Sequence, residues 1–394
     1  KKLLSYNHTT TTTEEKKEFH GLDPWVQWVS IHNGIPMKEH GVKRLGYLPS
    51  KNSKNIWNKL SKNKDIKWLV MGVMNSSKGN SRGCVSFFPD PWSSKEKAYP
   101  QELNNLLSLP RYVSKNYLSL NFFTVLKKSL KTFKFFLRIE NFNLTKNLFL
   151  KLLFSFRKPG INIHTLTTLF DYLLVLYFSK VKSKEDPEFS IIFLNHIAHL
   201  QHHFWGKTPY IHPQMEHGLK ICNEIIKILF SSAKNNEEKI LIINGFKQEL
   251  SNKNGIQVYR QINPKKVLEE LNIKNVKIEQ NMTNDAKLIF KEKSDANKAF
   301  EILSKCYILN TEERLFFVEK FSELEIFIQL DINHKISHDA LIISENKVIA
   351  FYDFFTNLNR TGSHIPEGDI FFKNMDIPEK IANHNIYDYI FNSF

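Results

Sequence analysis

The stretch FLNHIAHLQHHFW, residues 193–205, gathers the side chains most able to carry chemistry. Drawn as a helix, it places four of them on one face: Asn195, His199, His202 and His203. A neutral imidazole ligates zinc-like metals, and its pKa near neutrality also suits a general base or nucleophile. The stretch directly follows an apolar run, and sites in open α/β sheets form beyond the carboxyl ends of strands. It is therefore the first candidate site.

Two other observations qualify this cluster. His196 is expected on the opposite side of the turn, where it would pair with Gln201 or with solvent. The Gly-bracketed loop NRTGSHIPEG, from residue 359, holds His364, and metals recruit ligands from distant segments. The alternative for any single histidine is a polar helix residue bonded into a core.

Three apolar runs, each rich in Ile or Val, read as buried strands: 66–75, 189–195 and 239–245. Helical patterns separate them, for example at 213–234, and DPWVQWVSIHNGIP predicts a helix between Asp23-Pro24 and Asn33-Gly34. Strands alternating with helices predict an α/β fold with a mostly parallel central sheet and helices on both faces. The closely spaced runs from 287 to 355 predict some antiparallel strands in the C-terminal part.

Charge marks out a separate segment. The net charge is +15, and residues 101–183 hold 13 Lys/Arg against 3 Asp/Glu. Such a segment indicates an anionic partner or, alternatively, a solvated helical face. The predicted division is a polar, exposed lead-in over 1–23, an α/β domain over 24–100 and 184–394, and a basic helical insertion, or cap, over 101–183.

Within the insertion, an amphipathic helix is expected around 121–142. Its apolar stripe recurs at spacings of three and four: Phe122, Leu126, Leu130, Phe133 and Leu137. Lys127, Lys131, Lys134 and Arg138 fall on another stripe. Packing of the apolar stripe on the domain is favoured, and contact with a membrane surface through 120–158 is the alternative.

The cysteine pattern and the hydropathy of the sequence limit the cellular compartments in which we expect the protein. The three cysteines form no CxxC pair, which favours a reducing compartment over a disulfide framework or zinc ribbon. The sequence contains no run of about 18 uncharged apolar residues, so no membrane-spanning helix is expected. The expected location is cytoplasmic or peripheral to a membrane. Nucleic acid is disfavoured as a partner, because no finger, helix-turn-helix or RNP-like pattern accompanies the charge.

Several stretches, taken in order, resemble the alkaline phosphatase superfamily, in its type I phosphodiesterase/nucleotide pyrophosphatase and sulfatase-like branch. WVSIHNGIPMKEHGV (28–42) resembles the family's S-x-x-TG-x-x-P-x-x-HG segment, and FLNHIAH resembles its strand-end D-x-x-x-H metal motif. TGSHIPEG resembles the late loop whose His binds metal, which implies a ligand role for His364. PWVQWVSIHNG, PDPW and FLNHIAHLQHHFW further resemble a divergent bacterial subgroup.

Departures from that family limit the implied chemistry. Its first strand, with a metal-binding Asp, belongs before the point where this sequence begins, so that strand is lost or lies outside the sequence. The usual nucleophile window falls on 24–27, which has no hydroxyl, and Ser30 is the nearest one. The family's D-H-G metal pair falls near NGFKQ, without either ligand. One zinc-like divalent metal or none is therefore expected, with an anionic small molecule or glycan as substrate.

The candidate residues fall into three roles. The catalytic candidates are His199, His202, Ser30 and Asp90. The substrate-binding candidates are Asn195, Gln201, Lys247, Arg360 and Glu367. The metal candidates are His199, His203 and His364. Asp90 and Glu367 would orient a histidine, and Lys247 and Arg360 would hold an anionic group.

Two functions remain open at this point. The first is a hydrolase or transferase for phosphate or sulfate esters of an anionic glycan or lipid-linked substrate, with a reduced histidine-rich site. The second is a catalytically lapsed relative that binds an anionic glycan, a lipid or a membrane surface. Convergence of His199, His202 and His364 in space would favour the first.

Overall fold

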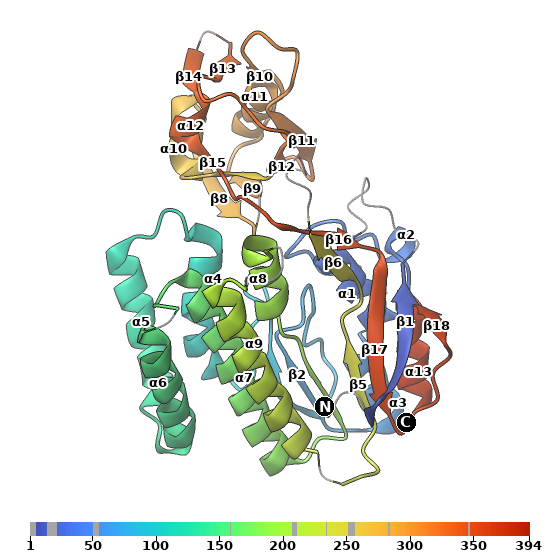
Figure 1. The fold of residues 1–394 in the computed structure, drawn as a ribbon. Coiled ribbons are helices and arrows are strands. Elements are labelled where there is room, and N and C mark those ends of the chain that lie inside the picture. The colour runs from blue at the N-terminus through green and yellow to red at the C-terminus, as the bar shows by residue number, and fades with distance from the viewer. Residues whose placement is uncertain are drawn as a thin grey trace. The chain divides into compact units, whose positions relative to one another are not determined.

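The computed structural model describes residues 5–13, 22–49, 55–157, 159–206, 211–233, 235–250, 257–282, 284–345 and 347–394. They form two compact units (Figure 1). Unit 1 comprises Lys1–Pro110, Lys127–Leu250 and Gly362–Phe394, and unit 2 comprises Arg111–Leu126 and Ser251–Thr361. This division differs from the predicted one, which places 251–361 in the same α/β domain as the histidine stretch.

Unit 1 contains a parallel sheet of the predicted kind. Its order is β3-β2-β4, with β2 at Trp68–Met71, β3 at Cys84–Phe88 and β4 at Phe189–Ile192. β2 is apolar throughout and buried on both sides, as strands covered on both faces are. Alternation along β2 sends Leu69 and Met71 into one core and Trp68 and Val70 into another.

Helices cover both faces of this sheet, as predicted. The core with Trp68 is completed by side chains of α3 (Ile56–Lys64) and α13 (Ile386–Asn392), which follows the 3₁₀ turn η4 (Asn383–Asn385). The core with Leu69 is completed by α4 (Leu103–Asn116) and α7 (Ile163–Glu185).

A second sheet in unit 1 corrects the expected predominance of parallel strands. Its order is β18-β1-β17-β5, and only the β1–β18 pair is parallel. The strands are β1 (Asn7–Thr12), β5 (Ile240–Ile243), β17 (Glu367–Lys373) and β18 (Lys380–Ala382). The run at 239–245 is thus a strand as predicted, but it pairs antiparallel with β17 instead of joining β2. The short apolar pattern could not reveal its partner.

β1 also corrects the expected exposed lead-in. Asn7–Thr12 lies between β17 and β18, with Thr9 and Thr11 buried. Thr is β-branched and uncharged, so an alternating run can serve as a strand with one buried face. Of the remaining lead-in, 1–4 and 14–21 lie outside the described residues.

The expected helix at the start of the α/β region is confirmed. α1 runs from Pro24 to Asn33, with Pro at its first position and Gly34 closing it at a φ of 69°. That left-handed conformation suits glycine and explains the Asn-Gly stop. α2 (Met37–His40) follows after one short turn, and α9 (Pro213–Ser231) fills the predicted 213–234 helix.

Residues 101–183 are largely helical. After α4 come α5 (Phe122–Phe136), the 3₁₀ turn η3 (Ile139–Asn141), α6 (Phe142–Arg157) and α7. The apolar stripe predicted on α5 exists, but its favoured packing on the domain is wrong: Leu130, Phe133 and Leu137 are exposed. Among the described residues, none of the helices combines the length and apolar character that a membrane span requires.

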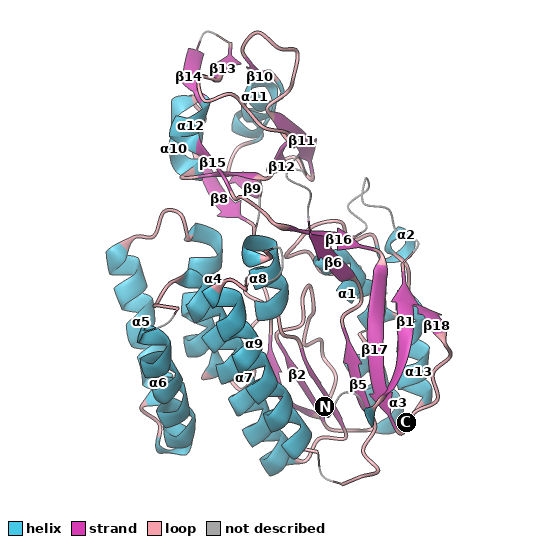
Figure 2. Ribbon diagram, viewed as in Figure 1, coloured by secondary structure: helices cyan, strands magenta, loops and turns pink. Residues whose placement is uncertain are grey.

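Unit 2 is dominated by antiparallel strands, which confirms that part of the prediction (Figure 2). One sheet has the order β11-β12-β9-β8, another the order β10-β13-β14, and β7 pairs with β15. The strands are β7 (Tyr259–Gln261), β8 (Val276–Gln280), β9 (Asp285–Phe290), β10 (Cys306–Ile308), β11 (Phe316–Lys320), β12 (Glu325–Leu330), β13 (Leu341–Ser344), β14 (Lys347–Ala350) and β15 (Phe355–Asn357). The helices are α10 (Pro264–Glu270), α11 (Lys293–Ser304) and α12 (Phe351–Phe354), and they share one apolar core with these strands.

Candidate functional site

The histidine stretch forms α8 (His196–Phe204), directly after β4. The 359–372 loop supplies β16 (Gly362–Ile365), which pairs antiparallel with β6 (Lys247–Leu250). The side-chain amide of Gln248 donates to the carbonyl of Ala198 at 3.1 Å and so ties β6 to α8. A Cβ at Gly362 would lie 2.8 Å from the carbonyl oxygen of Gln201, so only glycine lets β16 approach α8 this closely.

This approach brings together two predicted histidines that are 162 positions apart in the sequence. His202 Nε2 lies 3.1 Å from His364 Nε2, and both side chains are half-buried. His202 Nδ1 lies 2.9 Å from the carbonyl oxygen of Gly362. Because a carbonyl only accepts, Nδ1 of His202 carries a proton, and the neutral ring has its lone pair on Nε2. His364 Nε2–H then donates to that lone pair.

A second group of imidazoles lies on the other predicted residues of α8. His199 Nε2 is 2.9 Å from Nδ1 of His164, and the ring of His203 lies about 5 Å from both other rings. His164 stands in the first turn of α7, where Asn162 caps the helix by accepting from the amides of His164 and Thr165. Burial, and then the neighbouring charge of His212, lowers the pKa of His164.

His196 corrects the expected pairing with Gln201 or solvent. It is buried, and its Nδ1 lies 2.9 Å from Oδ2 of Asp171 on α7. The same oxygen accepts from the amides of Asn195 and His196 at 2.7 and 2.8 Å. Burial alone would lower the pKa of His196, but the hydrogen bond and charge of Asp171, together with the neighbouring Cys222, raise it to about 9. The group fixes the start of α8 and uses the backbone of Asn195, whose side chain makes no capping bond.

Ser30 has a histidine partner, yet the geometry opposes a nucleophilic role. Ser30 Oγ lies 3.1 Å from Nε2 of His40, and His40 Nδ1 accepts from the amide of Val42 at 3.1 Å. The neutral ring therefore carries its proton on Nε2 and donates it to Ser30. A ring in this tautomer cannot take the Ser30 proton. Burial lowers the pKa of His40 to about 4, which keeps the ring neutral.

Asp90 is part of a turn, and among the described residues its carboxylate bonds to backbone amides and a hydroxyl instead of to a histidine. Its two oxygens accept from the amides of Asn75, Trp92 and Ser93 and from the Ser93 hydroxyl. Burial raises the pKa of this carboxyl group against the effect of those bonds. The described contacts give Asp90 an architectural role instead of the predicted orienting one.

The other predicted binding residues are dispersed. Lys247 Nζ pairs with Asp369 at 2.9 Å, and although partial burial raises the pKa of Asp369, bonds from Lys247 and His8 lower it overall. Glu367 is exposed at the start of β17. Arg360 belongs to unit 2. Gln201 contributes its backbone carbonyl beside Gly362.

The predicted metal ligands do not fit one ion. His364 is directed at His202, whereas His199 and His203 lie with His164. Within the part of the chain that the structure describes, no group of three or more His, Cys, Asp or Glu side chains could hold a metal ion. Zinc requires three or four such ligands at about 2.0–2.3 Å.

Sequence reasoning missed two residues of the site. His164 lies within INIHTLTT, and no sequence spacing links this stretch to α8. His164 contacts His199 of α8 only because α7 packs beside α8. The sequence places Gly362 in a loop. Its close approach to α8 depends on the tertiary fold, so the sequence could not reveal it. The Asn-Ile-His-Thr pattern does offer one signal, since Asn is a preferred helix cap and places His164 in the first turn.

Comparisons with known proteins give similarities to solved structures only. Human ectonucleotide pyrophosphatase / phosphodiesterase 5 is 11% identical with a TM-score of 0.40, over 99% of this chain and 88% of the other. The murine protein of that name is similar in two structures, at 9% identity and TM-scores of 0.39 and 0.38, over 99% and 98% of this chain and 87% of each other chain. One of these is an inactive variant in complex with AMP. No family model and no curated protein matches the chain.

Proposed function

We propose that the chain is a hydrolase or transferase acting on phosphate or sulfate esters, with the His202–His364 pair as its reactive centre. The observation that carries the proposal is the 3.1 Å approach of the two Nε2 atoms from segments distant in sequence. The ordered motifs that resemble the phosphodiesterase and sulfatase-like branch suggest the reaction class. An anionic glycan or lipid-linked ester is the proposed substrate, in keeping with the net charge of +15.

The pair can move one proton through a displacement at phosphorus or sulfur. As the oxygen of water or of an alcohol acceptor bonds to that atom, Nε2 of His202 exchanges its hydrogen bond from His364 for the acceptor's proton. The bond to the ester oxygen breaks, and the resulting imidazolium returns the proton to the departing oxygen. The bond from His202 Nδ1 to Gly362 fixes the orientation of its ring and stabilises the cation while it exists.

The proposed test measures the purified full chain on aryl phosphate, aryl phosphodiester and aryl sulfate, with and without EDTA. His202→Asn is the informative variant, because the Asn amide can still donate to the Gly362 carbonyl while Nε2 is deleted. We expect turnover of at least one ester that EDTA does not abolish, and a loss of about 10²–10⁴-fold in kcat for the variant. His334→Asn, at an exposed position in unit 2, is the matched control.

A lapsed relative is the second candidate, favoured by a His40 tautomer that donates to Ser30 instead of activating it. On this proposal the imidazole groups bind an anionic glycan without turning it over. Equilibrium dialysis with heparin, used as the anionic glycan, distinguishes the two. Binding that falls in His202→Asn, with all three esters inert, supports the lapsed relative and contradicts the hydrolase.

A further inference from the structure

Two successive helices, α5 and α6, each expose a stripe of large apolar side chains on their residues in unit 1. We call these residues the outer face: Leu130 and Phe133 on α5, Leu137 in the turn directly after it, and Phe142, Phe149 and Leu153 on α6. Their exposed fractions lie between 52% and 66%. The first three residues are spaced by three and four positions, and the last three by seven and four. Residues at these helical spacings lie on one side of a helix. Monomeric proteins leave single apolar side chains exposed, but a recurring stripe on two neighbouring helices indicates a surface that is covered in use.

The opposite sides of the same helices are firmly attached. Phe135 and Leu144 are buried in the core that also holds Leu69 of β2. At the end of α6, Lys151 pairs with Glu224 at 2.6 Å, and Ser155 Oγ lies 2.8 Å from a ring nitrogen of His217, both partners being on α9.

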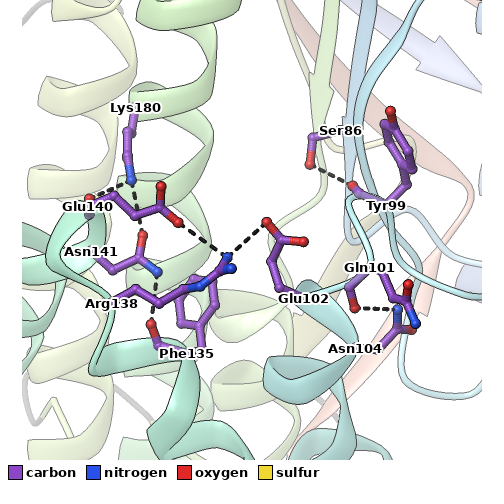
Figure 3. Close-up of polar contacts among 10 residues, drawn as sticks. All are labelled: Ser86, Tyr99, Gln101, Glu102, Asn104, Phe135, Arg138, Glu140, Asn141 and Lys180. Atoms are coloured by element: carbon purple, nitrogen blue, oxygen red, sulfur yellow. Dashed lines mark hydrogen bonds and ion pairs between the residues drawn. The ribbon is translucent and has the colours of Figure 1, made fainter.

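The corner between the two helices is fixed as well (Figure 3). Arg138 lies between Glu102 and Glu140, at 2.9 and 3.2 Å. Lys180 of α7 donates to the Glu140 carbonyl and to Asn141 Oδ1, and Asn141 donates to the Phe135 carbonyl. The exposure of the outer face therefore belongs to a helix pair that is anchored on its other side.

The charge of the residues around the outer face indicates what kind of surface this face binds. Residues 122–155 hold seven basic side chains and one acidic one, Glu140, which is already paired with Arg138. Four of the lysines, Lys127, Lys131, Lys134 and Lys146, are exposed beside the apolar stripes. Among the described residues no acidic side chain forms an ion pair with these four. Phe and Leu bordered by Lys are typical of helices that lie in a bilayer interface.

We infer that the outer face docks on an anionic lipid bilayer, with its Phe and Leu side chains in the acyl boundary and the flanking lysines at the headgroups. A protein partner fits less well, because protein interfaces, although enriched in Phe, are depleted in Lys, and four exposed lysines border this surface. Anionic headgroups also attract basic segments electrostatically, which adds to the apolar contribution. This inference does not depend on the histidine chemistry.

The test is co-sedimentation of the full chain with vesicles of phosphatidylcholine alone or mixed with phosphatidylglycerol. We expect binding to the mixed vesicles that weakens with salt. Replacing Leu130, Phe133 and Leu137 together by Ser should weaken partitioning by at least roughly a hundredfold, since one buried apolar side chain accounts for about tenfold or more. Lys127→Gln, Lys131→Gln and Lys134→Gln together should remove the preference for anionic vesicles.

The matched control replaces three exposed apolar residues elsewhere by Ser: Leu219, Phe317 and Val348. It should bind as the wild type does, and circular dichroism should show folded protein for every variant. Equal binding by the wild type and the outer-face variant would overturn the inference. So would a wild type that ignores mixed vesicles but self-associates through these side chains, because a second copy would then be the occupant.

Discussion

At the scale of single residues, what a histidine can do is decided by the partner of its other ring nitrogen. His202 faces a carbonyl through Nδ1 and therefore offers an Nε2 lone pair. His40 faces an amide N–H through Nδ1 and therefore offers an Nε2 proton. The two rings thus have opposite tautomers. One suits a base, and the other suits a donor that holds Ser30 in place.

Ser30→Ala should therefore leave any esterase activity unchanged and cost about 1 kcal/mol of stability, the usual contribution of one neutral hydrogen bond. Activity assays and urea unfolding of the same preparation measure both quantities. Loss of turnover with unchanged stability would instead make Ser30 a nucleophile and would refute the tautomer assigned to His40.

Residue types in the sequence singled out the histidines of α8 and His364, but not how these side chains group in space. The helical spacing correctly placed His199 and His203 near each other, yet it could not supply His164 from α7. It also predicted that His196 pairs with Gln201 or with solvent, whereas the side chain is buried against Asp171. A buried ion pair of this kind depends on a partner 25 positions away, which no local pattern encodes.

At the scale of elements, α8 depends on Asp171. One carboxylate oxygen accepts two backbone amides and the His196 ring at the helix start. The pKa of His196 is raised to about 9, above its ordinary 6.5, so this stabilisation is full below pH 6.5 and is lost as the pH rises through about 9.

Asp171→Asn should lower the free energy of unfolding by about 3–5 kcal/mol at neutral pH, because it leaves a buried partner uncompensated. The difference from the wild type should shrink as the pH rises through about 9. Urea unfolding at several pH values measures it, with the exposed Asp388→Asn as the control. A difference that is independent of pH would contradict the charged state of His196.

Element types were largely predictable, whereas their partners were not. The apolar runs gave the positions of β2, β4 and β5, and the Asp-Pro and Asn-Gly signals gave both ends of α1. The pairing of β5 with β17 requires a strand far along the chain, which periodicity does not identify. The stripe on α5 was visible in the sequence, but its exposure depends on where neighbouring helices pack.

At the scale of the whole molecule, buried neutral histidines make the fold sensitive to acid. Burial lowers the pKa of His32 to about 3 and that of His40 to about 4. Because both lie below the ordinary 6.5, the unfolded chain takes up these protons first. Their stabilising contribution is full above pH 6.5 and is lost as the pH falls from there toward 4 and 3.

His32→Phe should therefore flatten the acid side of the stability profile. His32 stacks on Trp28 and contacts Trp57, so a phenyl ring preserves the packing while removing the titration. Urea midpoints between pH 7 and about 4 check this expectation, with the exposed His334→Phe keeping the wild-type slope. An unchanged slope in His32→Phe would show that other groups govern acid unfolding.

The division into two units is the feature of the fold that was hardest to predict from the sequence. The strands of 257–357 carry the same apolar alternation as the rest of the chain, and only their mutual packing closes a separate core. The His202–His364 site lies within unit 1, because β6, β16 and α8 all belong to that unit. Its geometry is therefore internal to one compact body.

The central claim is that His202 and His364 act as one unit, and a double-mutant cycle on kcat/KM tests it most directly. His202→Asn and His364→Asn are compared with the double variant on the ester that the wild type turns over. We predict that each single variant loses about 10²–10⁴-fold and that the double variant loses no more, since partners in one catalytic unit are not additive. Losses that multiply, or full activity in either single variant, would contradict the account.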